Sequence, residues 1–199
     1  MSCLRKKYVA LDGVACNFKT SSLTQLHNMR PDIMPMYCDY AEFNNKYGHK
    51  DIGNGMQTRH LPEFNSIYTA WFRQQSYKLN AVYDRFPSSS LLYSLIFRRA
   101  TNAEYLAVFA MMDEFELLQH WKILVVLPKE GDETLVVQAM IKRANGIDDL
   151  SVDYVLEQRK AFKMFAKYFN LKIIYVSFTN IQESINEICE SLNDMIDTV

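Results

Sequence analysis

The stretch "LDGVACNFKT" at residues 11–20 follows the phosphate-loop pattern G-x-x-x-x-G-K-[ST] at every defined position but one. Gly13, Lys19 and Thr20 stand in register, and Phe18 occupies the place of the second glycine. In such a loop, backbone N–H groups and a helix N-terminus bind phosphate oxygens, while the lysine reaches the outer phosphates and the hydroxyl holds magnesium. The stretch is therefore a working phosphate site, the remnant of one, or an ordinary strand-to-helix turn.

Outward from this stretch, short apolar runs alternate with amphipathic patterns of helical period. The runs predict strands at residues 6–14, 32–40, 80–83, 121–128 and 171–178. The periodic segments predict helices at residues 20–29, 62–79, 90–100, 103–118, 132–144, 151–169 and 180–196. Strands that are apolar throughout and alternate with helices predict a three-layer α/β/α fold with a mainly parallel central sheet. The length of 199 residues suits a single domain.

Composition restricts the classes of partner. The formal net charge is −1 and no basic block stands out, so we expect no extended nucleic-acid surface. No apolar run approaches the roughly 20 residues of a membrane span, and the N-terminus lacks a signal-peptide pattern. We therefore expect an intracellular protein in a reducing compartment, the cytoplasm or the nucleus. The cysteines have no zinc-site spacing: Cys3, Cys16, Cys38 and Cys189.

The segment "VYDRFPSSSLLY" contains Asp84 and Arg85 directly after a predicted strand, with serines and Tyr93 behind them. With the loop, this segment resembles the D-R-Y-x-x-S-x-x-A-Y motif of the thymidylate kinases, and more broadly of the nucleoside and nucleoside-monophosphate kinases. "WFRQQ" is similar to the family's arginine-bearing helix and puts Arg73 at the matching place. The segment at about residues 142–150 resembles the family's lid. The resemblance keeps its order across nearly the whole chain.

The resemblance implies the P-loop kinase fold and phosphoryl transfer from ATP to a deoxynucleotide or nucleoside. Cations must converge on the transferred group, whose charge spreads over its oxygens. The implied roles are as follows: catalysis by Lys19, Arg85 and Arg143; ATP binding by Gly13, Lys19, Thr20 and Asp84; magnesium ligation by Thr20 and Asp84; and acceptor binding by Arg73, Asp39 and the aromatic residues Tyr68, Trp71 and Phe72.

Two departures from the family pattern open alternatives. A bulky residue at positive φ is an outlier, so Phe18 should distort the loop or place its ring where phosphate would lie. The second strand lacks the family's arginine and offers Asp39 and Glu42 instead.

One hypothesis is a kinase-derived protein with a degenerate loop, its activity impaired or lost, that acts through binding or self-assembly. The alternatives are an active ATP-dependent kinase with an atypical loop, or an unrelated α/β domain. The family commonly forms dimers, so we expect a homo-oligomer or a larger assembly under the first two hypotheses.

Overall fold

A five-stranded parallel sheet forms the centre of the protein. The computed structural model describes residues 8–37, 80–86, 88–144 and 148–198. In the order β2-β3-β1-β4-β5, the strands are β2 (Met34–Met36), β3 (Ala81–Asp84), β1 (Tyr8–Gly13), β4 (Trp121–Pro128) and β5 (Lys172–Val176). Central strands β1 and β4 are buried along most of their length, which explains why they are apolar on both faces.

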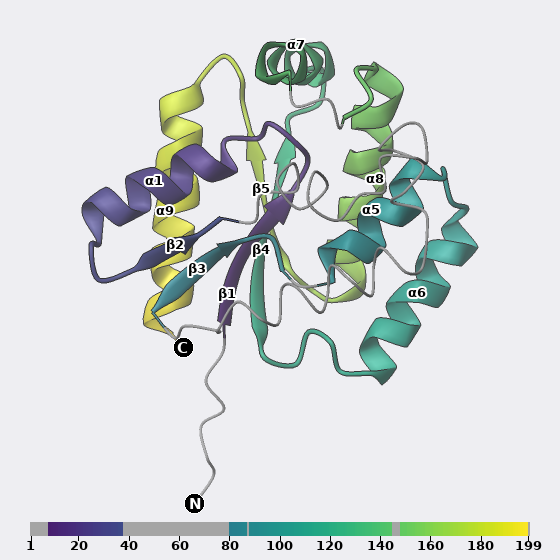
Figure 1. Ribbon diagram of the computed structural model, residues 1–199, viewed down its shortest axis with the longest axis horizontal. Helices are drawn as coiled ribbons and strands as arrows, with labels where there is room; N and C mark the ends of the chain where they lie inside the picture. The colour runs from purple at the N-terminus through teal and green to yellow at the C-terminus, as the bar shows by residue number, and fades with distance from the viewer. Residues whose placement is uncertain (1–7, 38–79, 87, 145–147, 199) are drawn as a thin grey trace, which may run out of the picture.

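Helices cover both faces of the sheet (Figure 1). One face carries α1 (Lys19–Met29) and α9 (Ile181–Asp197); the other carries α5 (Ser89–Phe97), α6 (Asn102–Glu114) and α8 (Val152–Tyr168), and α7 (Glu133–Arg143) follows β4 at the carboxyl edge. The strand order changes direction at β1, so the crevice in which α/β proteins bind ligands lies at the carboxyl end of that strand. No helix in the described ranges is both long enough and apolar enough to cross a membrane.

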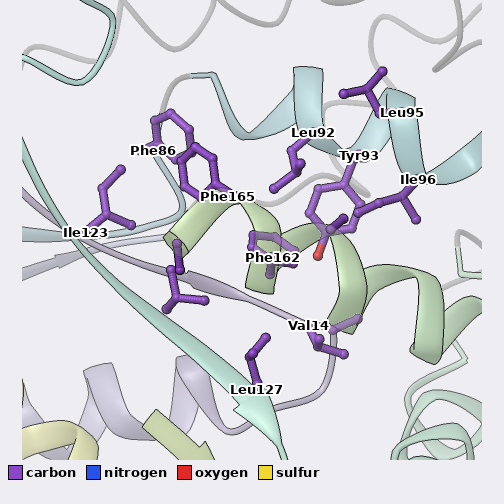
Figure 2. Close-up of a cluster of buried hydrophobic side chains, with 14 of the residues drawn as sticks. Val14, Phe86, Leu92, Tyr93, Leu95, Ile96, Ile123, Leu127, Phe162 and Phe165 are labelled. Atoms are coloured by element: carbon purple, nitrogen blue, oxygen red, sulfur yellow. The ribbon is translucent and has the colours of Figure 1, made fainter. Parts of the chain in front are cut away.

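Each face of the sheet has its own hydrophobic core. The core under α5, α6 and α8 is rich in aromatic rings: Phe86 stacks on Phe165 with ring centroids 5.5 Å apart, and Tyr93 packs edge-on to Phe162 at 5.7 Å (Figure 2). The core under α1 and α9 is mainly aliphatic. Both cores reach the carboxyl end of β1, where Val14 lies in the aromatic core (Figure 2). The residues that follow β1 are therefore held from both sides.

The sequence-based prediction of the fold class is confirmed. Strands and helices alternate as expected, and α1 begins at Lys19, one residue before the predicted start. Of the second strand, expected at residues 32–40, the described part pairs with β3 over Met34–Met36, and residues 38–40 lie outside the described residues. The helix predicted at residues 62–79 lies outside the described residues, and the single-domain organisation stays a prediction.

Gly13 ends β1 where the chain approaches β4 most closely. Its φ of +134° is rare for residues with a side chain, and an added Cβ would lie 2.0 Å from the carbonyl oxygen of Val126. The next residue, Val14, donates its backbone N–H to the same carbonyl at 3.2 Å. The turn out of the sheet thus requires glycine on two counts, backbone conformation and space.

We expect Gly13→Ala to lower the free energy of unfolding by about 2–4 kcal/mol, since backbone strain and overpacking both act there. Gly131→Ala is the matched control: its φ is +94°, but no heavy atom lies within 4 Å of an added Cβ. Strain alone should cost that variant about 1 kcal/mol. Urea denaturation measures both values, and equal losses would contradict the role given to the contact with Val126.

Candidate functional site

The second half of the loop between β1 and α1, together with the first residues of α1, leaves a run of backbone N–H groups without acceptors among the described residues. Cys16 and Phe18 both have left-handed conformations, with φ of 59° and 56°. Among the described residues, none accepts a hydrogen bond from the backbone N–H groups of residues 16–21; the first bond of α1 runs from the N–H of Ser22 to the carbonyl of Phe18. Consecutive free N–H groups at a helix N-terminus form a concave site suited to an anion.

Phe18 adopts the backbone conformation that a glycine would favour at its position. Its ring packs against Phe178, which follows β5, with ring centroids 4.7 Å apart, and it contacts the aliphatic core. The sequence led us to expect a distorted loop or a ring in the place of phosphate. The structure differs from the first expectation, because the ring has an apolar surface to pack on and the loop keeps its left-handed turn. The second expectation stays a prediction.

Lys19 begins α1 and is 6% exposed. Its Nζ atom donates to the carbonyl oxygens of Val14 at 2.6 Å and Gly13 at 3.3 Å, so the side chain folds back over the loop. Burial lowers the pKa of Lys19 to about 8, the charge of Arg85 acts in the same direction, and Asp84 opposes it. The ammonium group is therefore poorly compensated and would gain from a nearby anion.

Thr20 and Asp84 come from different elements and meet at the carboxyl edge of the sheet. The hydroxyl of Thr20, in the first turn of α1, donates to Oδ2 of Asp84, the last residue of β3, at 3.2 Å. The other carboxylate oxygen, Oδ1, is buried and has no hydrogen-bond partner among the described residues. The two residues predicted to hold magnesium thus lie side by side.

Arg85 pairs with Asp12, a partner that no sequence pattern indicated. Its Nη1 atom donates to Asp12 Oδ1 at 2.9 Å, and its guanidinium lies 4.5 Å from the centre of the Tyr93 ring. Asp12 is fully buried at the end of β1; burial raises the pKa of its carboxyl, and the Arg85 guanidinium opposes the rise. The ion pair fixes Arg85, at φ 82°, directly beneath the loop.

Tyr93 and Gln158 fasten the first half of the loop, a role that sequence reasoning missed for both. The Tyr93 hydroxyl donates to the Gly13 carbonyl at 3.0 Å and to Oε1 of Gln158 at 3.3 Å. The same Oε1 atom accepts the backbone N–H of Ala15 at 3.0 Å. Burial raises the pKa of Tyr93 above its ordinary value, so the hydroxyl remains a donor. A polar glutamine on the buried face of the helical pattern at residues 151–169 was the available signal.

Arg143 ends α7 and pairs with Asp148 across the segment predicted to be a lid. Asp148 is held in addition by the hydroxyl of Tyr154, which donates to it at 3.4 Å. Burial raises the pKa of Cys16 in the loop, and the charge of Arg143 opposes the rise.

The structure brings together the residues predicted for ATP and metal binding: Gly13, Lys19, Thr20, Asp84 and Arg85. The residues predicted for acceptor binding lie outside the described residues: Asp39, Tyr68, Trp71, Phe72 and Arg73. In the described part of the chain, no group of three or more His, Cys, Asp or Glu side chains gathers into a metal site.

The lowered pKa of Lys19 predicts how stability depends on pH. In the unfolded chain the ammonium group of Lys19 has its ordinary pKa of 10.5, whereas in the folded protein its pKa is about 8. Between these values the unfolded state binds more protons, so the free energy of unfolding rises with pH. Relative to Lys19→Met, the wild-type protein should gain about 1–2 kcal/mol between pH 7.5 and 9.5, measured by urea denaturation. Parallel pH profiles for the two proteins would mean that Lys19 keeps an ordinary pKa.

No protein-family model matches the chain. The chain is 24% identical over 190 residues to a protein described as "Uncharacterized 33.9 kDa protein in PE 3'region" of Lymantria dispar multicapsid nuclear polyhedrosis virus. The match covers 94% of this chain and 64% of that relative, so the chain spans less than two thirds of the relative's length.

Similar solved structures are kinases and a nucleotide complex. Deoxyadenosine kinase from M. mycoides, solved with dCMP and dCDP and also with dATP, superposes with a TM-score of 0.59 at 12% identity, covering 94% of this chain and 99% of that one. The YorR protein from Bacillus subtilis, in complex with phosphorylated GDP, gives a TM-score of 0.51 at 12% identity, covering 96% of each chain. At this identity the likeness concerns the fold, and the chain has the α/β fold of the P-loop kinases.

Proposed function

We propose that this protein is an ATP-dependent kinase that phosphorylates a nucleoside or a deoxynucleotide. The observation that carries the proposal is the convergence at the N-terminus of α1. Free backbone N–H groups, the buried ammonium of Lys19 and the Thr20–Asp84 pair gather there above Arg85. These groups come from separate segments of the chain, and each one has a use in binding or transferring a phosphoryl group.

The loop supplies the site for the phosphates of ATP. Its N–H groups and the positive end of the α1 dipole favour an anion, and Lys19 is held nearby by the carbonyl oxygens of Gly13 and Val14. Because burial already disfavours the charged lysine, a phosphate at the loop would restore the stability of its ammonium form. The lysine then acts on the outer phosphates, where negative charge accumulates during transfer.

Magnesium fits the residues present. It is a hard cation that prefers oxygen ligands, and the Thr20 hydroxyl and the Asp84 carboxylate offer adjacent oxygens. One of these oxygens, Asp84 Oδ1, is buried and has no hydrogen-bond partner in the part of the chain that the structure describes. When bound, the ion would neutralise phosphate charge. Arg85 and Arg143 would add positive charge around the transferred group, Arg85 from its fixed place beneath the loop and Arg143 from the end of α7.

A nucleoside or nucleotide acceptor is supported at the level of the fold alone. The structure of the M. mycoides enzyme is described as that of a deoxyadenosine kinase, and the YorR complex contains a guanine nucleotide. A shared fold does not by itself transfer an activity, so the acceptor class is tested directly with a panel of nucleosides and nucleoside monophosphates. We propose Arg73, on the family resemblance, and Asp39, which the second strand offers where the family has an arginine, as the side chains that bind the acceptor.

The competing proposal is a kinase-derived protein that has lost turnover and acts through binding or self-assembly. It rests on Phe18, which was expected to distort or obstruct the loop, and on the arginine that the second strand lacks. The packing of the Phe18 ring on Phe178 and the left-handed turn of the loop argue against the first of these reasons. The retained Lys19, Thr20 and Asp84 geometry favours an active enzyme.

We expect millimolar MgATP to raise the unfolding temperature of the wild-type protein. Saturation at one hundred times the dissociation constant adds about 2.7 kcal/mol, or about 5–10 °C for a chain of this size. Lys19→Ala should abolish the shift, because it removes the cation at the loop. The control Lys167→Ala alters an exposed lysine near the end of α8 and should keep the full shift.

The companion assay follows transfer of the γ-phosphoryl group of ATP to each acceptor in the panel. Transfer that is lost in Lys19→Ala supports the kinase. A thermal shift without transfer to any acceptor would favour the repurposed protein. Absence of both would overturn nucleotide binding altogether.

Thr20→Val should weaken the dependence of ATP binding on magnesium while leaving magnesium-free binding intact. The valine keeps the shape of the side chain and removes the oxygen that lies beside Asp84. Thr24→Val is the matched control, since its hydroxyl is exposed one turn further along α1 and bonds to Thr20 O and Tyr37. Titration of ATP with and without magnesium measures the effect, and equal magnesium dependence in both variants would rule out Thr20 as a ligand.

A further inference from the structure

Phe18 occupies a conformation that ordinarily has to be enforced. Its φ of 56° and ψ of 8° lie in the left-handed region, at the residue immediately before α1. For a residue with a Cβ this region is less favourable than the right-handed one by about 1–2 kcal/mol. In the described residues, α1 has no side-chain N-cap hydrogen bond that would offset this cost. Ser22 of α1 restrains the carbonyl of Phe18 by donating its N–H and its hydroxyl to it, and the packing of the Phe18 side chain is the other restraint on this conformation.

The Phe18 side chain packs on the ring of Phe178, and the two residues are called the Phe18–Phe178 pair. The two ring centroids are 4.7 Å apart and the ring planes are tilted by 44°. Phe18 packs against the aliphatic core under α1 and α9, while Phe178 packs against the aromatic core on the other face. The pair thus connects the two cores at the carboxyl edge of the sheet, where no strand separates them.

Phe178 is itself firmly placed. Its backbone N–H donates to the carboxylate of Asp132, the residue before α7, at 2.9 Å. The preceding residue, Ser177, donates its N–H to the hydroxyl of Ser184 at 2.9 Å. The hydroxyls of Ser177 and Thr179, the two residues that flank Phe178, lie 2.8 Å apart. The ring of Phe178 is a fixed surface, and the ring of Phe18 is the partner that depends on it.

We propose that Phe178 is a positioning residue for nucleotide binding, which acts by keeping Phe18 left-handed. A glycine adopts the left-handed turn readily because it has no side chain. Here the packing of the two rings makes the left-handed turn the populated state of the loop. This inference rests on the proposed function, because it assigns the loop to phosphate binding. It adds a residue far along the chain, which does not touch the loop's N–H groups, as a determinant of ATP affinity.

Loss of the Phe178 ring leaves Phe18 free to relax toward the right-handed or extended regions. Only the left-handed fraction of the protein can then present its N–H groups to phosphate, and the apparent affinity falls with that fraction. Loss of an aromatic contact of this kind should lower the apparent affinity for MgATP about threefold to tenfold. A glycine at position 18 populates the left-handed region without help, so its affinity should no longer depend on Phe178.

The experiment measures the dissociation constant of MgATP by calorimetry for the wild-type protein and three variants. Phe178→Ala should raise the constant about threefold to tenfold. The double variant Phe18→Gly with Phe178→Ala should recover affinity relative to Phe178→Ala alone. Phe169→Ala is the matched control: this half-buried ring packs on Phe165 and Tyr168 at the end of α8, and its removal should leave the constant unchanged. If Phe178→Ala does not fold, Phe178→Leu keeps the apolar volume and replaces it.

The outcomes separate this inference from the proposed function. A wild-type protein that does not bind MgATP overturns both. Wild-type binding that is unchanged in Phe178→Ala overturns the inference alone. A weakened Phe178→Ala that glycine at position 18 fails to rescue also overturns it, because the ring would then act on the nucleotide itself or on general stability. Weakening together with rescue is the expected result.

Discussion

The carbonyl oxygen of Gly13 is the point on which the arrangement of the site depends. It accepts from the Tyr93 hydroxyl at 3.0 Å, from Lys19 at 3.3 Å and from Arg85 at 3.4 Å. These donors come from α5, from α1 and from the end of β3. They can meet at one atom because Gly13 brings the chain against Val126, closer than any side chain would allow. A single turn of backbone therefore sets the positions of the groups that the proposed chemistry requires.

The cations at this edge of the sheet differ in the partners that hold them. Lys19 donates to backbone carbonyl oxygens, whereas Arg85 and Arg143 pair with the carboxylates of Asp12 and Asp148. The side chains of both carboxylate partners are buried, so loss of either ion pair would leave an unpaired buried charge. We infer that Arg85 and Arg143 act from fixed positions, whereas Lys19 can turn toward a ligand.

The sequence predicts the frame of this site well and its internal contacts poorly. Alternating strands and helices place the ends of β1 and β3 at one edge of a parallel sheet. The sequence therefore predicts that Lys19, Thr20 and Asp84 lie near one another. The partner of Arg85 was not predictable, because adjacency in the sequence favours Asp84 and only the register of β1 against β3 brings Asp12 beneath it. Gln158 was hidden for the same reason, as its contact with Ala15 spans 143 positions.

Phe18 shows why a motif read one residue at a time can mislead. A left-handed phenylalanine costs about 1–2 kcal/mol, which is small beside the 5–15 kcal/mol that stabilises a typical domain. Substitution of the motif glycine therefore does not forbid the loop; it makes the loop conditional on a neighbour that keeps the ring packed. Glycine imposes no such condition, which is why the pattern is usually written with it. In this chain Phe178 meets the condition from the loop after β5, beyond the reach of any local pattern.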